Sequence, residues 1–219
     1  MAITMRSDEL NIVQEQVIEK RDILDIDTFF DEMYLTESEK KERKDLAKSI
    51  FVILSAILTV IKATETLKRE HDVEYYKNFI SESMKELYEK VFGSAKYSTY
   101  IDDFADNFID VTMRSISSSN GVEYFTSDDR ATVNAENESN AVHNRKQRDD
   151  AIVNGATHKT WITKRDKRVR KTHVAADGQT VEIDKPFLVG GYEMMFPMDK
   201  SRGAHSKECI NCRCVTIYS

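Results

Sequence analysis

The chain has 219 residues, 40% hydrophobic and 32% charged, a composition ordinary for a soluble globular protein with one or two domains. With only two Pro and seven Gly residues, the sequence favours long helices over many turns. All three cysteines lie within the last eleven residues, which excludes a secreted disulfide framework and favours metal ligands or reduced thiols in a cytoplasmic setting.

The net charge of −6 hides two halves of opposite sign. Residues 141–219 hold 15 Lys and Arg against 9 Asp and Glu, a net of +6, so the first 140 residues carry −12. The basic half could meet a polyanion or the acidic half of another copy; the alternative is two solvated faces.

No membrane contact is expected. Met1 to Leu10 lacks the apolar stretch of a signal peptide, and the longest apolar run, Ile50 to Ile61, is shorter than the roughly 20 residues that cross a bilayer.

The first 116 residues are predicted to form a helical domain. Residues 7–24 have an amphipathic pattern, and a capping box at Thr36 and Glu39 begins a helix expected to reach about Glu70. Its middle, residues 50–61, is apolar on nearly all sides, which predicts a core helix or a helix packed against another subunit. Further helices are predicted over 73–92, ended by Gly93, and over 97–116.

Residues 117–155 are predicted to form a polar linker and an Asn-rich helix. The helix is expected to begin at the capping sequence 126–129, and it places Asn134, Asn137, Asn140 and Asn144 on one face. We interpret that face as solvated, with ligand binding as the alternative.

Residues 156–219 are predicted to form a small α+β module, so the fold class is α+β. Strands are expected near 159–163, 180–184 and 213–218, with a short helix over 167–176 and a turn at Asp177 and Gly178. A module of about sixty residues has little core, and a bound metal is a common staple for such modules.

The cysteines and one histidine predict a structural zinc site. Zinc prefers four Cys or His ligands, and the predicted set is His173, Cys209, Cys212 and Cys214, with His205 as a local alternative. Buried reduced thiols are the competing interpretation.

A catalytic role is a weaker alternative. Arg170, His173 and Asp177 have helical spacing and could act as acid and base in a small ribonuclease-like toxin, or Cys212 could be a nucleophile activated by His173. The same spacing suits a salt-bridged structural corner, and we expect no enzymatic activity.

A basic segment predicts sequence-independent DNA binding through phosphates. Arg170 is assigned to the fold instead, because of its spacing to His173. The predicted DNA-binding residues are Lys159, Lys164, Arg165, Lys167, Arg168 and Lys171.

The order of short motifs in this region resembles the minor head proteins of tailed bacteriophages, the Mu F-like head morphogenesis family. The matching residues are Lys159 and Trp161, Asp166, Arg170 and His173, Asp177 and Gly178, Phe187, Pro197 and Asp199, and Asn211 to Cys214. Trp161, Arg170, Asp177, Gly178 and Asn211 are taken as structural positions of the motif.

The resemblance implies a low-copy virion component inside the capsid near the portal, assembled in the host cytoplasm. Portal, capsid or scaffolding proteins and DNA are the implied partners, ejection with the genome is thought to occur in some relatives, and self-association is an open alternative. Many relatives carry cysteines where Arg170 and His173 stand and a histidine where Cys209 stands, a set that looks like a zinc site. A zinc-stabilised intracellular DNA-binding module without a virion role is a further alternative.

Overall fold

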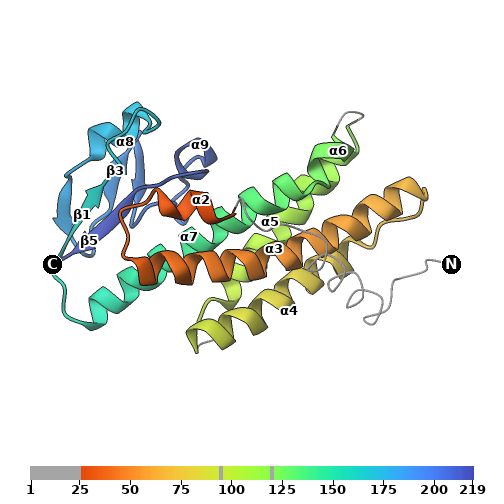
Figure 1. Cartoon of the computed structure of the whole chain (residues 1–219), viewed down its shortest axis with the longest axis horizontal. Coiled ribbons are helices and arrows are strands. Elements are labelled where there is room, and N and C mark those ends of the chain that lie inside the picture. The colour runs from red at the N-terminus through yellow and green to blue at the C-terminus, as the bar shows by residue number, and fades with distance from the viewer. Residues whose placement is uncertain (1–25, 94–95, 119–120) are drawn as a thin grey trace. The chain divides into compact units, whose positions relative to one another are not determined.

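A computed structural model describes residues 26–93, 96–118 and 121–219 (Figure 1). Helices fill most of the first two thirds of the described chain, and a small antiparallel sheet module follows, which confirms the predicted α+β class. The amphipathic helix predicted over residues 7–24 lies outside the described residues.

The chain forms two compact units, and the boundary between them falls inside two helices. The described residues of one unit are Lys48–Ala135 without the two gaps, and those of the other are 26–47 and Glu136–Ser219. We call them the helical unit and the C-terminal unit. This division differs from the three predicted domains, 1–116, 117–155 and 156–219. Whether those three segments fold separately stays a prediction.

The long helix α3 (Glu37–Thr66) begins as the capping box predicts. The Glu39 backbone N–H donates to Thr36 Oγ1 at 3.3 Å, and the Thr36 N–H donates to a Glu39 carboxylate oxygen at 2.8 Å. By length and composition α3 could span a membrane, but 67% of its apolar window is buried inside the protein, as in the core helix of a soluble domain.

The helical unit is built from the later part of α3, α4 (Val73–Phe92), α5 (Ser98–Ile116), the short α6 (Val122–Phe125) and the first turns of α7 (Asp128–Val153). Helices α4 and α5 pack side by side (Figure 1). Gly93 ends α4 in the left-handed conformation, as expected of a helix C-terminus. The apolar run of α3 supplies the core, with Ile50, Leu54 and Ile57 fully buried.

The start of α7 is one residue later than the capping prediction. Ser127, rather than Thr126, receives the backbone N–H of Arg130 on its hydroxyl, while the Thr126 hydroxyl donates back to the Val122 carbonyl. Thr126 therefore completes the short helix α6, which the sequence pattern did not reveal.

The C-terminal unit combines α2 (Ile26–Asp31), the first turns of α3 and most of α7 with a three-stranded antiparallel sheet. The strand order is β2-β1-β5, with β1 (His158–Ile162) between β2 (Thr180–Glu182) and β5 (Val215–Tyr218). Trp161 lies opposite Thr216 in this register. All three strands lie where the sequence predicts them.

A second, two-stranded hairpin was not predicted. Strands β3 (Phe187–Val189) and β4 (Tyr192–Met194) pair across Gly190 and Gly191, whose φ angles of 60° and 84° fit the hairpin turns that favour glycine. Each strand has three residues, too short for an alternating pattern. The two short helices of this unit are α8 (Lys171–Ala176) and α9 (Ser206–Cys209).

The predicted helix over 167–176 is therefore too long. Arg170 is extended, with ψ of 145°, and Asp177 is extended at the other end, with ψ of 125°. The segment before Arg170 forms a turn, in which the Val169 N–H donates to the Asp166 carbonyl at 3.1 Å. Arg170, His173 and Asp177 consequently do not share one helical face.

We expect Leu54→Ala to lower the free energy of unfolding by about 2–5 kcal/mol, because a buried leucine is replaced by a cavity. Leu58, which is 1% exposed, should behave in the same way. Thr59→Ala, at an exposed position of the same helix, is the control. Urea titration checks this, and a Leu54 variant as stable as the control would assign the apolar run to a partner surface instead.

Candidate functional site

A buried cluster of one histidine and two cysteines forms the clearest site in the described chain. His173 comes from α8, and Cys212 and Cys214 lie on the stretch that leads into β5. His173 Nδ1 is 3.3 Å from Cys214 Sγ and 3.6 Å from Cys212 Sγ, and the ligand atoms of all three lie within 4.8 Å of one another. Each residue is at most 2% exposed.

Cys209 does not belong to this group of converging atoms. It is 1% exposed and packs in the apolar core with Trp161 and Phe187. Burial raises the pKa of the Cys209 thiol to about 11. The four predicted ligands are thus brought into one unit, but only three of them meet at one point.

The pKa values of the two clustered thiols are shifted in opposite directions. The pKa of Cys212 lies well below its ordinary value because Cys214 donates a hydrogen bond to it and the nearby His173 also favours the thiolate, although burial opposes both. The same Cys214–Cys212 bond, together with burial, raises the pKa of Cys214. A thiolate is thereby favoured on Cys212, the form that binds metals.

The geometry fits a zinc ion. Tetrahedral zinc, with Zn–S near 2.3 Å and Zn–N near 2.0 Å, holds its ligand atoms roughly 3.5–3.8 Å apart. The His173–Cys212 and His173–Cys214 distances are close to those values. Three donors with soft or borderline character could hold the ion and leave one position for another ligand.

Glu208 adjoins the cluster, and the sequence interpretation missed it. Its Oε2 lies 3.3 Å from His173 Nε2, on the side of the ring away from the sulfurs. The Glu208 side chain is 4% exposed. Its position beside Cys209 in the sequence gave no signal, because the contact joins side chains that lie 35 and 36 residues apart in the chain.

The five motif residues taken as structural all have contacts within the C-terminal unit. Trp161 is fully buried, with its ring edge-to-face with those of His173 and Phe187. Gly178, with φ of 80°, donates its N–H to the Trp161 carbonyl at 2.8 Å. Arg170 donates to the Ile210 carbonyl.

Asp177 and Asn211 hold loops in place. Asp177 accepts the Thr163 backbone N–H at 2.8 Å and Arg165 Nε at 2.7 Å. Asn211, with a left-handed φ of 55°, exchanges two hydrogen bonds with Asn137 on α7. Arg170, His173 and Asp177 thus have separate partners, and the geometry does not support the acid–base set of a ribonuclease.

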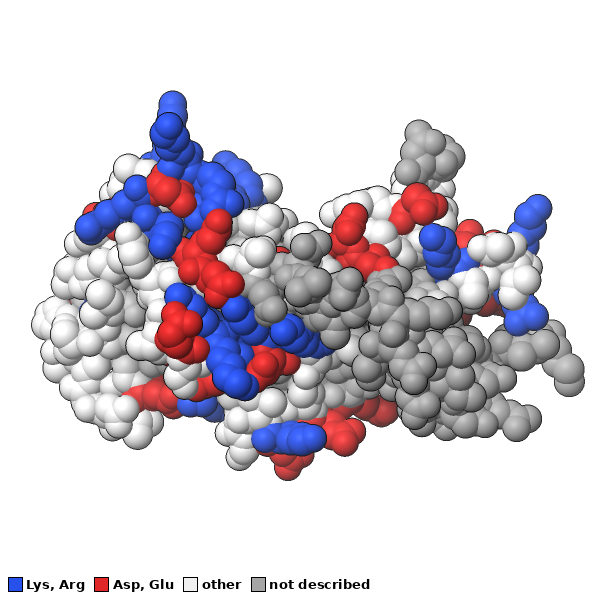
Figure 2. Space-filling model, viewed as in Figure 1, with Lys and Arg blue, Asp and Glu red and all other residues white. Residues whose placement is uncertain are grey.

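The basic segment is mostly an exposed loop before α8. Figure 2 shows Lys and Arg side chains gathered over the region where Figure 1 labels α8 and α9. Asp166, the acid within the segment, pairs with both nitrogens of the Arg213 fork at 2.6 and 2.8 Å, which holds its pKa at about 2. Arg165 pairs with Asp177 and Arg168 with Glu32, each arginine remaining 63% exposed.

Lys159 must be removed from the predicted DNA-binding set. It is fully buried, donates to the Met195 carbonyl at 2.7 Å and lies 4.8 Å from the centre of the Phe187 ring. Burial lowers its pKa to about 8. A lysine on the inward face of β1 cannot contact a phosphate, and the charge count along the sequence could not reveal this.

The interpretation of the Asn-rich face as solvated is wrong for its C-terminal half. Asn140 and Asn144 are at most 2% exposed, and their side-chain oxygens accept hydrogen bonds from Arg43 of α3. The Asn140 amide nitrogen donates to the Cys212 carbonyl, and that of Asn144 donates to the Pro197 carbonyl. The face is a buried polar seam within the C-terminal unit.

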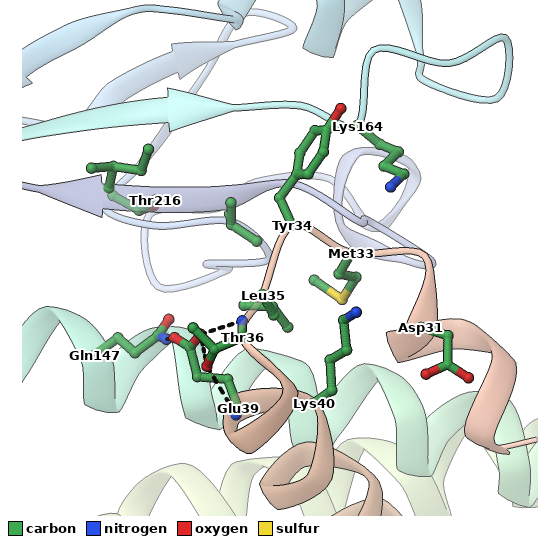
Figure 3. Close-up of a pocket in the computed structure, with 12 residues that line it drawn as sticks. Asp31, Met33, Tyr34, Leu35, Thr36, Glu39, Lys40, Gln147, Lys164 and Thr216 are labelled. Carbon is green, nitrogen blue, oxygen red and sulfur yellow. Dashed lines mark hydrogen bonds between the residues drawn. The ribbon is translucent and has the colours of Figure 1, made fainter.

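A pocket of about 580 Å³ lies beside the free edge of β5 (Figure 3). Tyr34 and Lys164 form one wall, where the lysine Nζ is 4.4 Å from the ring centre. Thr36, Glu39 and Gln147 lie on the opposite side. The pocket is lined by both acidic and basic side chains, so its charge does not favour phosphate.

Residues 82–217, more than half of the chain, match the family described as phage Mu protein F like protein. The chain belongs to the phage Mu protein F-like family. This is the family that the motif order predicts.

The matched range extends N-terminally beyond the C-terminal unit, into α4 and α5 of the helical unit. A segment is also similar to the NAD(+)–arginine ADP-ribosyltransferase EFV of Enterococcus faecalis (strain ATCC 700802 / V583), with 37% identity over 59 residues. That segment covers 27% of this family member but only 12% of the transferase. No solved structure matches the chain.

We expect acid to weaken the C-terminal unit through His143 on α7. Burial, reinforced by the nearby Arg43 charge, lowers the pKa of His143 from 6.5 to about 3. Between those values the unfolded chain binds a proton that the folded chain does not, so stability falls as pH falls from 6.5. At pH 5 the loss from this residue should be about 2 kcal/mol.

Urea titrations of wild type and His143→Gln at pH 8 and pH 5 check this. The variant should lose less stability than wild type between pH 8 and pH 5. The difference between the two proteins at pH 8 measures the cost of the substitution itself. Equal losses in the two proteins would contradict a buried neutral His143.

Proposed function

We propose that this protein acts in phage head morphogenesis, as a low-copy component of the capsid interior near the portal that contacts packaged DNA. Family membership supports the virion role. We further propose that portal and capsid or scaffolding proteins are its partners during assembly in the host cytoplasm, and that it can leave the capsid with the genome.

The observation that carries the DNA contact is the exposed basic loop before α8. Asp166 does not cancel its charge, because Arg213, from outside the segment, neutralises that carboxylate. Arg165 and Arg168 are held by surface ion pairs, which contribute little and can exchange for phosphates, and Lys164 lies against the Tyr34 ring. The available cations are Lys164, Arg165, Lys167, Arg168 and Lys171.

Phosphate contacts of this kind give binding without sequence preference. The net charge of −12 on residues 1–140 opposes DNA binding, so the acidic surface has to face away from the duplex or meet a partner.

We expect the logarithm of the DNA affinity to fall with the logarithm of the salt concentration, with a slope of about −4 if four of the five cations reach phosphates. Replacing Lys164, Arg165, Lys167 and Arg168 with Gln leaves at most one contact, so the slope should flatten to between 0 and about −1 and binding to all DNA sequences should weaken alike. Gel-shift titration on two unrelated duplexes measures both quantities.

The matched control removes the same charge from the helical unit. Its substitutions to Gln are at Lys62, Lys68, Arg69 and Lys90, all exposed. The control should keep most of the salt slope. If both variants bind alike, or if wild type fails to bind at micromolar concentration, the basic loop serves protein contacts instead.

We also propose that His173, Cys212 and Cys214 hold a structural Zn²⁺. The ion would join α8 to the stretch before β5 and so couple folding of this small unit to metal binding. The support is the convergence of three buried donors on one point and the thiolate favoured on Cys212. Cys209 is left out because its sulfur is not part of the group.

We expect about one zinc per chain in the purified protein and loss of that zinc in Cys212→Ala, whereas Cys209→Ala keeps it. Elemental analysis gives the stoichiometry, and circular dichroism with a chelator tests whether folding depends on the metal. Zinc well below one per chain in wild type, with the fold unchanged after chelation, would reject the site. Equal loss in both variants would restore Cys209 as a ligand.

A further inference from the structure

The two ring nitrogens of His173 face different chemical groups. Nδ1 is directed at the sulfurs of Cys212 and Cys214, at 3.6 and 3.3 Å. Nε2 is directed at Glu208, whose Oε2 is 3.3 Å away. The His173 and Glu208 side chains are 2% and 4% exposed, so water cannot easily replace either contact.

His173 Nε2 is a buried polar atom without a hydrogen bond of good geometry among the described residues. Leaving such an atom unpaired is unfavourable. The Glu208 carboxylate already lies at ion-pair distance, so a small rotation of the ring or of the carboxylate would complete the bond.

Glu208 is held in place by its surroundings. Thr172, the neighbour of His173 on α8, donates its hydroxyl to Glu208 Oε2 at 2.7 Å. On the other side lies the β3–β4 turn, where a Cβ built on Gly190 would come within 2.8 Å of the Glu208 carboxyl carbon and Oε1. The absence of a side chain at Gly190 therefore leaves the space that the carboxylate occupies.

The Glu208 carboxylate is buried without a Lys or Arg ion-pair partner among the described residues. A buried carboxylate without a cationic partner is strongly disfavoured. An imidazole that carries its proton on Nε2 and shares its Nδ1 lone pair with a cation would supply the missing partner.

We propose that Glu208 is a positioning residue for the metal site: it accepts the Nε2–H of His173 and thereby presents the Nδ1 lone pair between Cys212 and Cys214. A neutral imidazole has one N–H, so fixing the proton on Nε2 leaves Nδ1 free to bind a metal. Carboxylates in this outer position orient histidine ligands in many metal sites. The inference rests on the proposed zinc site.

The first test measures zinc affinity by competition with a chromogenic chelator, using the full chain and Zn²⁺ alone. Glu208→Ala should bind zinc 10–100-fold more weakly than wild type. Glu208→Gln keeps an acceptor oxygen and should recover most of that loss. Glu193→Gln, which removes an exposed carboxylate from the same unit, should bind like wild type.

The second test reads the histidine directly. In a long-range ¹H–¹⁵N spectrum of the zinc-loaded protein, with the signal assigned by comparison with His173→Gln, His173 should be protonated on Nε2 and metal-bound through Nδ1. This readout needs only wild type and the assignment variant, so it decides the question even if Glu208→Ala fails to fold.

Wild-type affinity in Glu208→Ala, or a His173 that binds zinc through Nε2, would overturn the role of Glu208 and leave the zinc site intact. A wild-type protein that binds no zinc would overturn both. Weaker binding in Glu208→Ala, recovery in Glu208→Gln and the Nε2-protonated tautomer would together establish the inference.

Discussion

The buried amide of Asn140 is the interaction on which the C-terminal unit most depends. Its oxygen accepts from the Arg43 guanidinium at 2.8 Å, and its nitrogen donates to the Cys212 carbonyl at 3.1 Å. One side chain of α7 therefore joins the start of α3 to the loop that carries the thiols. Because an amide both accepts and donates, neither an aspartate nor a leucine could make both contacts.

Arg43 shows why this seam uses amides. The guanidinium is fully buried, and its two terminal nitrogens donate to the side chains of Asn140, Asn144 and Gln147 and to the Asn140 carbonyl. Burial lowers the pKa of Arg43 to about 10. Several amide oxygens thus take the place that one carboxylate would have as the partner of the guanidinium. Because these amides lie at fixed positions along α7, they fix where the start of α3 lies along that helix.

The proposed metal site depends on the same frame. Asn140 binds the carbonyl of Cys212, and the rings of Trp161 and His173 pack edge-to-face at 5.7 Å. The cluster is thus held by a helix seam on one side and by the sheet on the other. Outside it lies the basic loop, where arginines form ion pairs with surface carboxylates and stay exposed. The proposed metal site and the exposed basic loop therefore both belong to the C-terminal unit.

The sequence by itself determined the elements with strong local signals. The capping box at Thr36, the apolar run of α3, the Gly93 stop and the alternating strands β1 and β5 were all predicted, because caps, periodicity and glycine conformations are local properties. The order of motifs also predicted the family. Cys212 and Cys214 were predicted to point the same way because they are two residues apart in an extended chain.

Only the tertiary structure decided which polar residues are buried. Asn140, Lys159 and Glu208 look solvated in sequence, yet each is at most 3% exposed. Their partners are distant in the chain: Arg43 lies 97 residues from Asn140, and Met195 lies 36 residues from Lys159. Sequence periodicity records how a residue relates to its own helix or strand, whereas burial of a polar group depends on a hydrogen-bond partner that another element supplies.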